Sequence, residues 1–354
     1  MHAITKLGSF AAIASLGLAP ILAACSSDAS TSGTGGAAAT GSSSATSSSS
    51  TGGSGGAAPA APTFVAHFDP TKSELAEGLL IDGGKAYIGY APLGKIVRVD
   101  LTGGAVEDFG NIPPVPANGG FLLGIVADAS GAVYVGFGGG PGTEVKNGVY
   151  KLPAAGGSVS APWAADAAMN FPNGLLFDEA GNLFVADSGG AIFKIAKDGT
   201  VSTWIADPSL AGAASTCAFM APFTIGANGI VKRGGAFYVS NTNLAQIVEI
   251  PINADGSAGT PSIFAGPDCD ALGGLDGIAL DADGSIVGVV NTQSKLVRVG
   301  TDGKVTTSFT GSPLDNPASV AIHAASGVRT AYITNAAFFD EKSPAPGLLG
   351  YPLP

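Results

Sequence analysis

The chain has 354 residues, of which 54 are Gly and only 12% are charged, against roughly 25% in an average soluble domain. Glycine recurs throughout, which excludes a helical bundle or coiled coil, because these folds need long runs of good helix formers. The net charge is −11, from 16 basic and 27 acidic residues, and no run of Lys or Arg is present. Nucleic acid is therefore not expected as a partner, since phosphate binding requires clustered cations.

The first 25 residues have the pattern of an export signal, in which Lys6 precedes an apolar run from Leu7 to Leu22. The tetrapeptide that ends it, Leu-Ala-Ala-Cys at 22–25, resembles the bacterial lipobox. That resemblance implies that residues 1–24 are removed and that lipidated Cys25 anchors an exported lipoprotein to a membrane. Because Ser26 is not the Asp of an inner-membrane retention signal, the outer membrane or cell surface is the expected destination. An ordinary secretory signal with an incidental cysteine is the alternative.

Residues 25–62 continue as a nearly unbroken series of Ser, Gly, Ala and Thr. This composition offers little to bury, so we expect a disordered tether. Beyond it, no apolar stretch approaches the ~18 residues that a membrane helix needs. Residues 63–354 are expected to form one soluble domain, and we expect a monomer that touches the membrane through its lipid anchor only.

A short pattern recurs along this domain: one residue followed by Gly, an apolar strand ending near Asp, a Gly-containing turn, and an aromatic-led strand. Its copies start at Glu77, Leu123, Asn173, Asn228 and Asp276, with a degenerate sixth at Ala318. Successive copies are 42 to 55 residues apart. The third copy contains four strand-length apolar runs separated by turns rich in Gly, Asn and Asp. The repeat predicts an all-β, six-bladed β-propeller with four antiparallel strands per blade.

The two ends of the domain supply a closure for such a ring. We expect Gly347–Tyr351 to form the third strand of the last blade and Thr63–Phe68, from the N-terminal end, to form its outer strand. An exchange of this kind ties the ring shut and covers its strand edges.

The residue just before each innermost strand is expected at the rim of the central channel. Four of the six carry side-chain oxygen atoms: Glu77, Asn173, Asn228 and Asp276. Hard oxygen ligands with two carboxylates suit Ca²⁺, with Zn²⁺, Mg²⁺ or Mn²⁺ as alternatives. Asn-Gly and Asp-Gly are also ordinary turn dipeptides, so a local role for three of these residues is the competing interpretation. Glu is a poor turn former, and Glu77 favours the metal site.

A second ring is predicted where the second strands return to the same face, at Tyr90, Phe137, Asp187, Asn241, Asn291 and Asn335. Two aromatic walls and four polar groups would form a cup for a small molecule or water. Self-satisfied turns at Asp187 and Asn241 are the alternative. Cys217 and Cys269, in an exported protein, are expected to form a disulfide, with two free buried thiols as the alternative.

The blades with Glu77-Gly78, Asn228-Gly229 and Asp276-Gly277 resemble the senescence marker protein (regucalcin)/gluconolactonase/lactonase family over most of residues 74–340. The resemblance implies one divalent cation held by Glu77, Asn228 and Asp276, with Asn173 contacting water or substrate. It also implies hydrolysis of a lactone or related ester. Phe171 departs from the family, because the gluconolactonases tend to have a substrate-binding Arg at that position.

Two functions follow from this reading. The first is a metal-dependent hydrolase in which Asp276 is a ligand and the general base, with Asp187 as an outside candidate for the base. The second is a non-catalytic surface propeller that binds a peptide, glycan or small ligand. The third blade keeps the second function open, because residues 172–189 also resemble an NHL repeat, whose propellers usually bind partners without catalysis.

Overall fold

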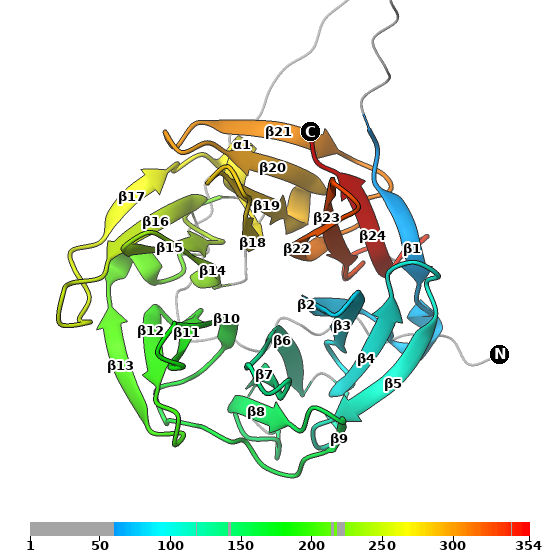
Figure 1. Ribbon diagram of the computed structural model, residues 1–354, viewed down its shortest axis with the longest axis horizontal. Helices are drawn as coiled ribbons and strands as arrows, with labels where there is room; N and C mark the ends of the chain where they lie inside the picture. Colours follow the sequence, from blue (N-terminus) through cyan, green and yellow to red (C-terminus); the bar gives the residue numbers. More distant parts are fainter. Residues whose placement is uncertain (1–59, 118, 141–142, 214–215, 218–223, 341) are drawn as a thin grey trace, which may run out of the picture. The chain divides into compact units, whose positions relative to one another are not determined.

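A computed structural model describes residues 60–117, 119–140, 143–213, 216–217, 224–340 and 342–354. Cys25 and the predicted signal and tether up to residue 59 lie outside these ranges. Within them, six β-sheets are arranged around a common axis, so the predicted six-bladed β-propeller is confirmed (Figure 1). No helix in the described part of the chain has the length and apolar character needed to cross a membrane.

Each blade runs outward from an innermost strand, and the chain visits the blades in sequence order. The first three sheets comprise β2 (Ala76–Asp82), β3 (Lys85–Tyr90), β4 (Lys95–Asp100), β5 (Val106–Asn111) and β9 (Gly157–Ser158); β6 (Gly120–Ala127), β7 (Val133–Gly139) and β8 (Gly148–Leu152); and β10 (Pro172–Phe177), β11 (Leu183–Asp187), β12 (Ala191–Ile195) and β13 (Val201–Ala206). Short β9 pairs in parallel with β5 of the first blade. In the second blade, an isolated bridge between Val149 and Ala164 continues the sheet beyond β8.

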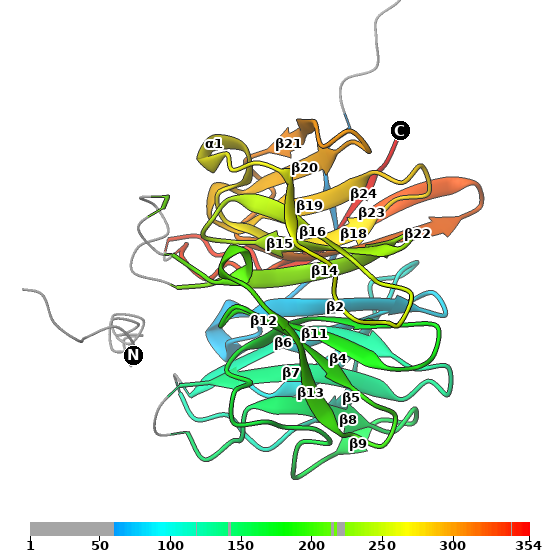
Figure 2. The ribbon, with the colours of Figure 1, turned by 90° about the vertical axis from the view of Figure 1, so that its left-hand side faces the viewer.

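The remaining blades have four strands each. They comprise β14 (Ala227–Arg233), β15 (Ala236–Asn241), β16 (Gln246–Pro251) and β17 (Ser262–Ala265); β18 (Leu275–Leu280), β19 (Ile286–Val290), β20 (Lys295–Val299) and β21 (Val305–Thr310); and β22 (Pro317–Ala325), β23 (Val328–Asn335), β24 (Gly347–Pro352) and β1 (Thr63–His67). In the described ranges, short helical segments that connect strands are η2 (Pro70–Lys72), η3 (Pro208–Leu210), α1 (Cys269–Leu272) and η5 (Asn291–Gln293). Figure 2 views the ring from its side, where β2 and β14 run from one face to the other.

The last blade closes the ring as predicted. Strand β1 pairs antiparallel with β24, and Figure 1 shows the two side by side. Phe68, just after β1, is buried and packs edge-on against Tyr90 of the first blade at 5.1 Å between ring centroids. The N-terminal strand therefore links the sixth blade to the first, which closes the ring without leaving an open edge at β24.

The hydrophobic core lies between neighbouring blades. One cluster joins Phe184 and Ile192 of the third blade to Phe237 and Val239 of the fourth, and Phe184 and Phe237 are 4.6 Å apart between ring centroids. Inner strands are apolar on both faces because each packs against two neighbouring blades. This packing leaves the first residues of the inner strands at one end of the axis, where the polar side chains collect.

Candidate functional site

A β-bulge interrupts the pairing of every inner strand at the axial position. The register shifts fall at 76–79, 122–125, 172–174, 227–230, 275–278 and 317–319, in β2, β6, β10, β14, β18 and β22. A bulge leaves one residue unpaired and changes the direction of its side chain. The six axial residues predicted from the repeat, Glu77, Leu123, Asn173, Asn228, Asp276 and Ala318, all lie in these bulges.

The glycine after each of the first five axial residues is required by the approach of the next blade. A Cβ atom on Gly78 would come within 2.0 Å of the Leu123 carbonyl oxygen, and one on Gly174 within 2.2 Å of the Asn228 carbonyl oxygen. These glycines lie inside strands, so the turn interpretation of Asn173, Asn228 and Asp276 is wrong. The X-Gly pattern marks the close packing of six backbones around the axis.

Glu77 and Asp276 form a buried pair of like charges. Their side chains belong to residues that are 6% and 9% exposed. Burial, together with the charge of Asp276, holds the pKa of Glu77 well above its usual value, and burial raises the pKa of Asp276 to about 8. Among the described residues, the ion pairs all involve other carboxylates, and Glu77 Oε2 is buried without a hydrogen-bond partner. This pair therefore lacks a compensating positive charge from the described chain.

Amide side chains from two further elements hold the Asp276 carboxylate. Hydrogen bonds from Asn228 and Asn291 lower the pKa of Asp276 and partly offset its burial. Asn228 comes from β14 and Asn291 from η5, which begins where β19 ends. The structure thus brings Glu77, Asn228, Asp276 and Asn291 together on the axis, with buried Asn173 at the matching position of the third blade.

Thr242 orients the Asn228 amide. The single hydroxyl proton of Thr242 is donated to the Leu275 carbonyl oxygen at 2.8 Å, so its Oγ1 must accept from Asn228, whose Nδ2 is 3.0 Å away. One Asn228 N–H is therefore directed at Thr242 and the other at Asp276, and the side-chain carbonyl oxygen of Asn228 is left for another partner. Thr242 also links the fourth blade to the residue that precedes Asp276.

Replacing Thr242 by Val is expected to weaken Ca²⁺ binding by about 10-fold, because outer hydrogen bonds to a metal ligand commonly contribute that much to affinity. The change preserves side-chain shape but removes the acceptor for Asn228. Titration calorimetry of the chelator-stripped protein measures the effect, and Thr242→Ser, which keeps the hydroxyl, is the matched control. Equal Ca²⁺ affinity in the Val and Ser variants would contradict an orienting role.

The residues on the axis fit a hard divalent cation. Two carboxylates from the first and fifth blades and an amide oxygen from the fourth are the ligand types that Ca²⁺ prefers. The orphaned Glu77 oxygen and the uncompensated pair both call for a positive charge at this point. In the described residues no three side chains of His, Cys, Asp and Glu gather, so the two carboxylates are joined on the axis by amide groups and not by a third residue of these types.

Stability of the metal-free protein is expected to fall as pH rises from about 4 to 8. In the unfolded chain, Glu77 and Asp276 lose their protons near pH 4. In the folded protein, the pKa of Asp276 is raised to about 8 and the pKa of Glu77 is raised well above its usual value, so both groups keep their protons to higher pH. Each group then lowers the free energy of unfolding by up to about 1.4 kcal/mol per pH unit in this range. Urea unfolding in chelator at pH 5 and pH 8 measures this slope. A Glu77→Gln/Asp276→Asn double variant should show a flatter profile, and an unchanged slope would refute the assignment.

The second predicted ring lies on the expected face, but most of its side chains point elsewhere. Tyr90 pairs with Ala76, and Phe137 pairs with Leu122, each opposite the residue before the axial one. Residues directly opposite in an antiparallel pair share a face of the sheet, so these side chains lie between blades. Tyr90 and Phe137 are 2% and 0% exposed and belong to the core. Their interpretation as walls of a cup is corrected accordingly.

Three polar members of that ring are hydrogen-bonded to backbone groups. Asp187 accepts from the amides of Phe171 and Gly189 at 2.8 and 2.9 Å, which uses both carboxylate oxygens. Asn241 donates to the carbonyls of Ser209 and Ala211, and Asn335 donates to those of Pro313 and Ala345. These contacts favour structural roles and weigh against Asp187 as a general base. Of this ring, Asn291 alone contacts an axial carboxylate among the described residues.

Sequence reasoning singled out Phe171 but missed its aromatic neighbours on this face. Phe121 and Phe171 each stand two residues before an axial residue, and Phe338 follows β23. The Phe121 ring centroid lies 6.3 Å from that of Phe171 and 5.8 Å from that of Phe338. The signal was available at the first two positions, where Phe121 precedes Leu123 by the same spacing as Phe171 precedes Asn173. Phe338 lies outside the repeat, so the sequence did not indicate its place.

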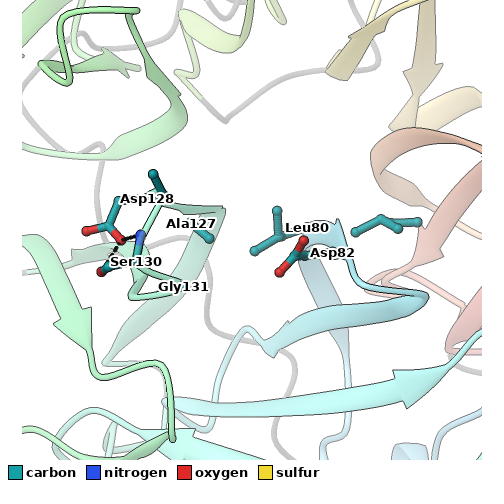
Figure 3. A pocket seen from close by; sticks show the side chains of 8 residues that line it. Leu80, Asp82, Ala127, Asp128, Ser130 and Gly131 are labelled. Atoms are coloured by element: carbon teal, nitrogen blue, oxygen red, sulfur yellow. Dashed lines mark hydrogen bonds between the residues drawn. The ribbon is translucent and has the colours of Figure 1, made fainter.

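A hollow of about 420 Å³ lies at the opposite ends of the first two inner strands, away from these residues. Leu80, Asp82, Asp128 and Gly131 line it (Figure 3). The Asp128 carboxylate accepts from the amides of Ser130 and Ala132 and from the Tyr134 hydroxyl. Its oxygens are therefore engaged in shaping the turn, and this hollow is separate from the axial carboxylates.

Cys217 and Cys269 form the predicted disulfide, with Cα atoms 5.7 Å apart. Cys269 begins α1, which leads into β18 and Asp276, and Cys217 lies in the segment before β14 and Asn228. The bridge therefore links the segments that lead to two of the candidate ligands, across a sequence separation of 52 residues.

The fold and the site define a six-bladed β-propeller with carboxylate and amide side chains gathered on its axis. Residues 224–337 match the sequence model of the family described as SMP-30/Gluconolactonase/LRE-like region. This stretch contains Asn228, Asp276 and Asn291, so the resemblance seen in the sequence is confirmed there. No curated protein matches the chain.

Solved structures share the propeller fold at low sequence identity. Regucalcin from Agrobacterium tumefaciens, described as a calcium-binding protein, is 18% identical, with 83% of this chain and 95% of that chain covered and a TM-score of 0.59. A luciferin-regenerating enzyme is 16% identical, with 79% and 92% covered and a TM-score of 0.55. An auxiliary nutrient binding protein from Bacteroides thetaiotaomicron is 11% identical, with 78% and 69% covered and a TM-score of 0.55. Proteins described as an enzyme and as binding proteins therefore share this propeller fold.

Proposed function

We propose that this protein is a divalent-cation-dependent hydrolase of lactones or related esters, with Glu77, Asn228 and Asp276 as the ligands of one Ca²⁺ ion. The observation that carries the proposal is the buried, uncompensated Glu77/Asp276 pair, with Glu77 Oε2 lacking a partner among the described residues. Two carboxylates kept close in an apolar interior are costly without a cation, and such groups collect at functional sites. The family match over residues 224–337 supports the lactonase chemistry.

The cation, when bound, would supply Lewis acidity that polarises a carbonyl group and promotes ionisation of water. Asp276, as a carboxylate, accepts the proton of the attacking water while a new C–O bond forms at the carbonyl carbon. Asn228 and Asn291 hold that carboxylate through their amide hydrogen bonds. When the ring C–O bond breaks, Asp276 returns the proton to the leaving alkoxide, and the product is a hydroxy acid. Asn173 orients substrate or water from the third blade.

The direct test is a lactone panel assayed on purified protein before and after removal of metal with a chelator. We expect hydrolysis that disappears on chelation and returns with Ca²⁺. Without the cation, no group polarises the lactone carbonyl for attack by water. Elemental analysis and melting curves with and without chelator accompany the assay. A metal-free protein whose melting temperature is indifferent to chelator would instead favour a non-catalytic propeller that binds a peptide, glycan or small ligand.

We further propose that the domain is exported and held at the outer membrane or cell surface by lipid on Cys25. The sequence of residues 22–25 supports this proposal. Replacing Cys25 by Ser is expected to move the protein from the membrane fraction to the soluble fraction, since acyl chains are the only membrane contact expected. Fractionation of the expressing cells followed by immunoblotting measures the change, with Ser26→Ala as the matched control. Equal membrane retention of the Cys25→Ser variant would contradict the anchor.

A further inference from the structure

The aromatic side chains on the axial face form a continuous cluster that reaches across blades. Phe121 lies in β6 of the second blade, and Phe171 directly precedes β10 of the third. Phe338 and Phe339 follow β23 of the sixth blade. We call these four residues the phenylalanine cluster. Its neighbouring rings are 5.8 to 6.3 Å apart between centroids. Because the first blade lies between the sixth and the second, the contact between Phe338 and Phe121 joins two blades that are not neighbours in the ring.

Hydrogen bonds connect this cluster to the axial carboxylates. The Phe339 amide donates to Asn316 Oδ1 at 3.0 Å, and Asn316 and Asn291 each donate an amide proton to the other's carbonyl. Asn291 in turn donates to the Asp276 carboxylate. The segment that carries Phe338 and Phe339 is therefore anchored through two amides to the proposed general base, so the cluster and the base belong to one site.

The third-blade member of the cluster is held by backbone and by a glycine opposite its ring. The Phe171 amide donates to buried Asp187, and a Cβ atom on Gly138 would come within 2.4 Å of Phe171 Cδ2. Phe121, Phe171 and Phe338 are half-buried and Phe339 is 52% exposed. The rings thus present apolar surface at the site while their positions are fixed.

The positions two residues before the six axial residues offer little to a polar substrate. They are Leu75, Phe121, Phe171, Gly226, Gly274 and Asn316. Both side-chain groups of Asn316 are already used, by the Phe339 amide and the Asn291 carbonyl. A polyhydroxylated lactone would lose water from its hydroxyl groups here without gaining hydrogen bonds from these side chains, which disfavours it.

We propose that the phenylalanine cluster is an apolar subsite that selects lactones or esters bearing an alkyl or aryl substituent over polyhydroxylated ones. This rests on the proposed function, because the substituent is placed relative to a carbonyl at the axial ligands. The rings pack on the substituent, and each buried methylene group of the substrate adds to transition-state binding. Phe171 and Phe338 each pack against Phe121 and set the preference together.

The test compares γ-butyrolactone with γ-nonalactone, which carries a pentyl group at the ring carbon. The wild-type protein is expected to show a kcat/KM at least 10-fold higher for γ-nonalactone. In Phe171→Ala and in Phe338→Ala the ratio of kcat/KM for γ-nonalactone to kcat/KM for γ-butyrolactone should fall roughly 10-fold, since a ring that covers the pentyl group is lost. The matched control is Phe309→Ala, which removes a half-buried Phe from outer strand β21 and should leave the ratio unchanged.

A wild-type ratio near 1, or a ratio that survives in both Phe171→Ala and Phe338→Ala, overturns the subsite. Calorimetry with the matching lactams, 2-pyrrolidinone and its 5-pentyl derivative, separates this result from failure of the proposed function. If neither lactone is hydrolysed, the hydrolase proposal fails, and the lactam affinities decide the subsite on their own. Tighter binding of the pentyl lactam that is lost in Phe171→Ala supports it, and equal binding of the two lactams refutes it.

Discussion

Replacing Asp276 by Asn is expected to lower kcat for lactone hydrolysis by about 10²- to 10⁴-fold and to weaken Ca²⁺ binding at the same time. The lower rate follows because an amide cannot accept the proton of water, and general-base catalysis contributes on this scale. The weaker binding follows because one of two negative ligands is lost. Steady-state kinetics with saturating Ca²⁺ and titration calorimetry measure the two effects separately.

Asp187→Asn is the matched control for this change. Asp187 is also a buried Asp on the same face, but its oxygens accept from the Phe171 and Gly189 amides. Its replacement should reduce stability while leaving one Ca²⁺ site and a measurable kcat. The account would be contradicted if Asp187→Asn abolished hydrolysis and Asp276→Asn did not.

Deleting residues 63–68 is expected to abolish cooperative unfolding of the propeller. The deletion removes β1 and its pairing with β24, exposes the edge of β24, and takes away Phe68, whose ring packs on Tyr90. Loss of a buried Phe alone costs about 3–5 kcal/mol, which approaches the total stability of many domains. Thermal and urea unfolding followed by circular dichroism measure the effect.

A deletion of six residues within the predicted tether, at 45–50, provides the control and should leave the transition in place. An unchanged melting curve for the 63–68 deletion would show that β1 does not close the ring. Loss of the transition in both variants would mean that the tether contributes to folding, which the composition of residues 25–62 does not predict.

The sequence was sufficient to predict the architecture because the repeat records backbone packing. Each X-Gly pair marks the point where an inner strand meets the backbone of the next blade, and Gly78 and Gly174 leave no room for a Cβ atom there. The repeat therefore located the axial residues even though the dipeptides also suggested turns. The bulges that set these residues apart from regular pairing were not predicted, since a bulge depends on the partner strand.

The second ring shows what a repeat cannot supply. The strand ends were placed on the correct face, but the direction of each side chain depends on which residue lies opposite it. Tyr90 lies opposite Ala76, and its side chain packs in the core. Asn291 is the first residue of η5 and lies beyond the end of β19, and its side chain reaches Asp276. Contacts between distant blades, such as Phe338 with Phe121, carry no signal in the spacing of either segment.

The hydroxyl groups that hold the axial backbone were also invisible in the sequence. Thr334 of the sixth blade donates to the Glu77 carbonyl at 2.7 Å, and Ser240 of the fourth donates to the Asp276 carbonyl at 2.7 Å. Both carboxylate-bearing residues are thus fixed by a hydroxyl from the preceding blade. Ser and Thr in a strand have many possible partners, so only the assembled ring shows this role.

The most direct test of the axial cation site is calorimetric titration of Ca²⁺ into the chelator-stripped protein at pH 8, with wild type and Glu77→Gln compared. Glu77→Gln keeps the size of the side chain and removes one of the two buried negative charges. The predicted result is one Ca²⁺ bound per chain in the wild type and an affinity at least 10-fold lower in the variant. No binding to the wild type, or equal affinity in both proteins, would contradict a cation held by Glu77, Asn228 and Asp276.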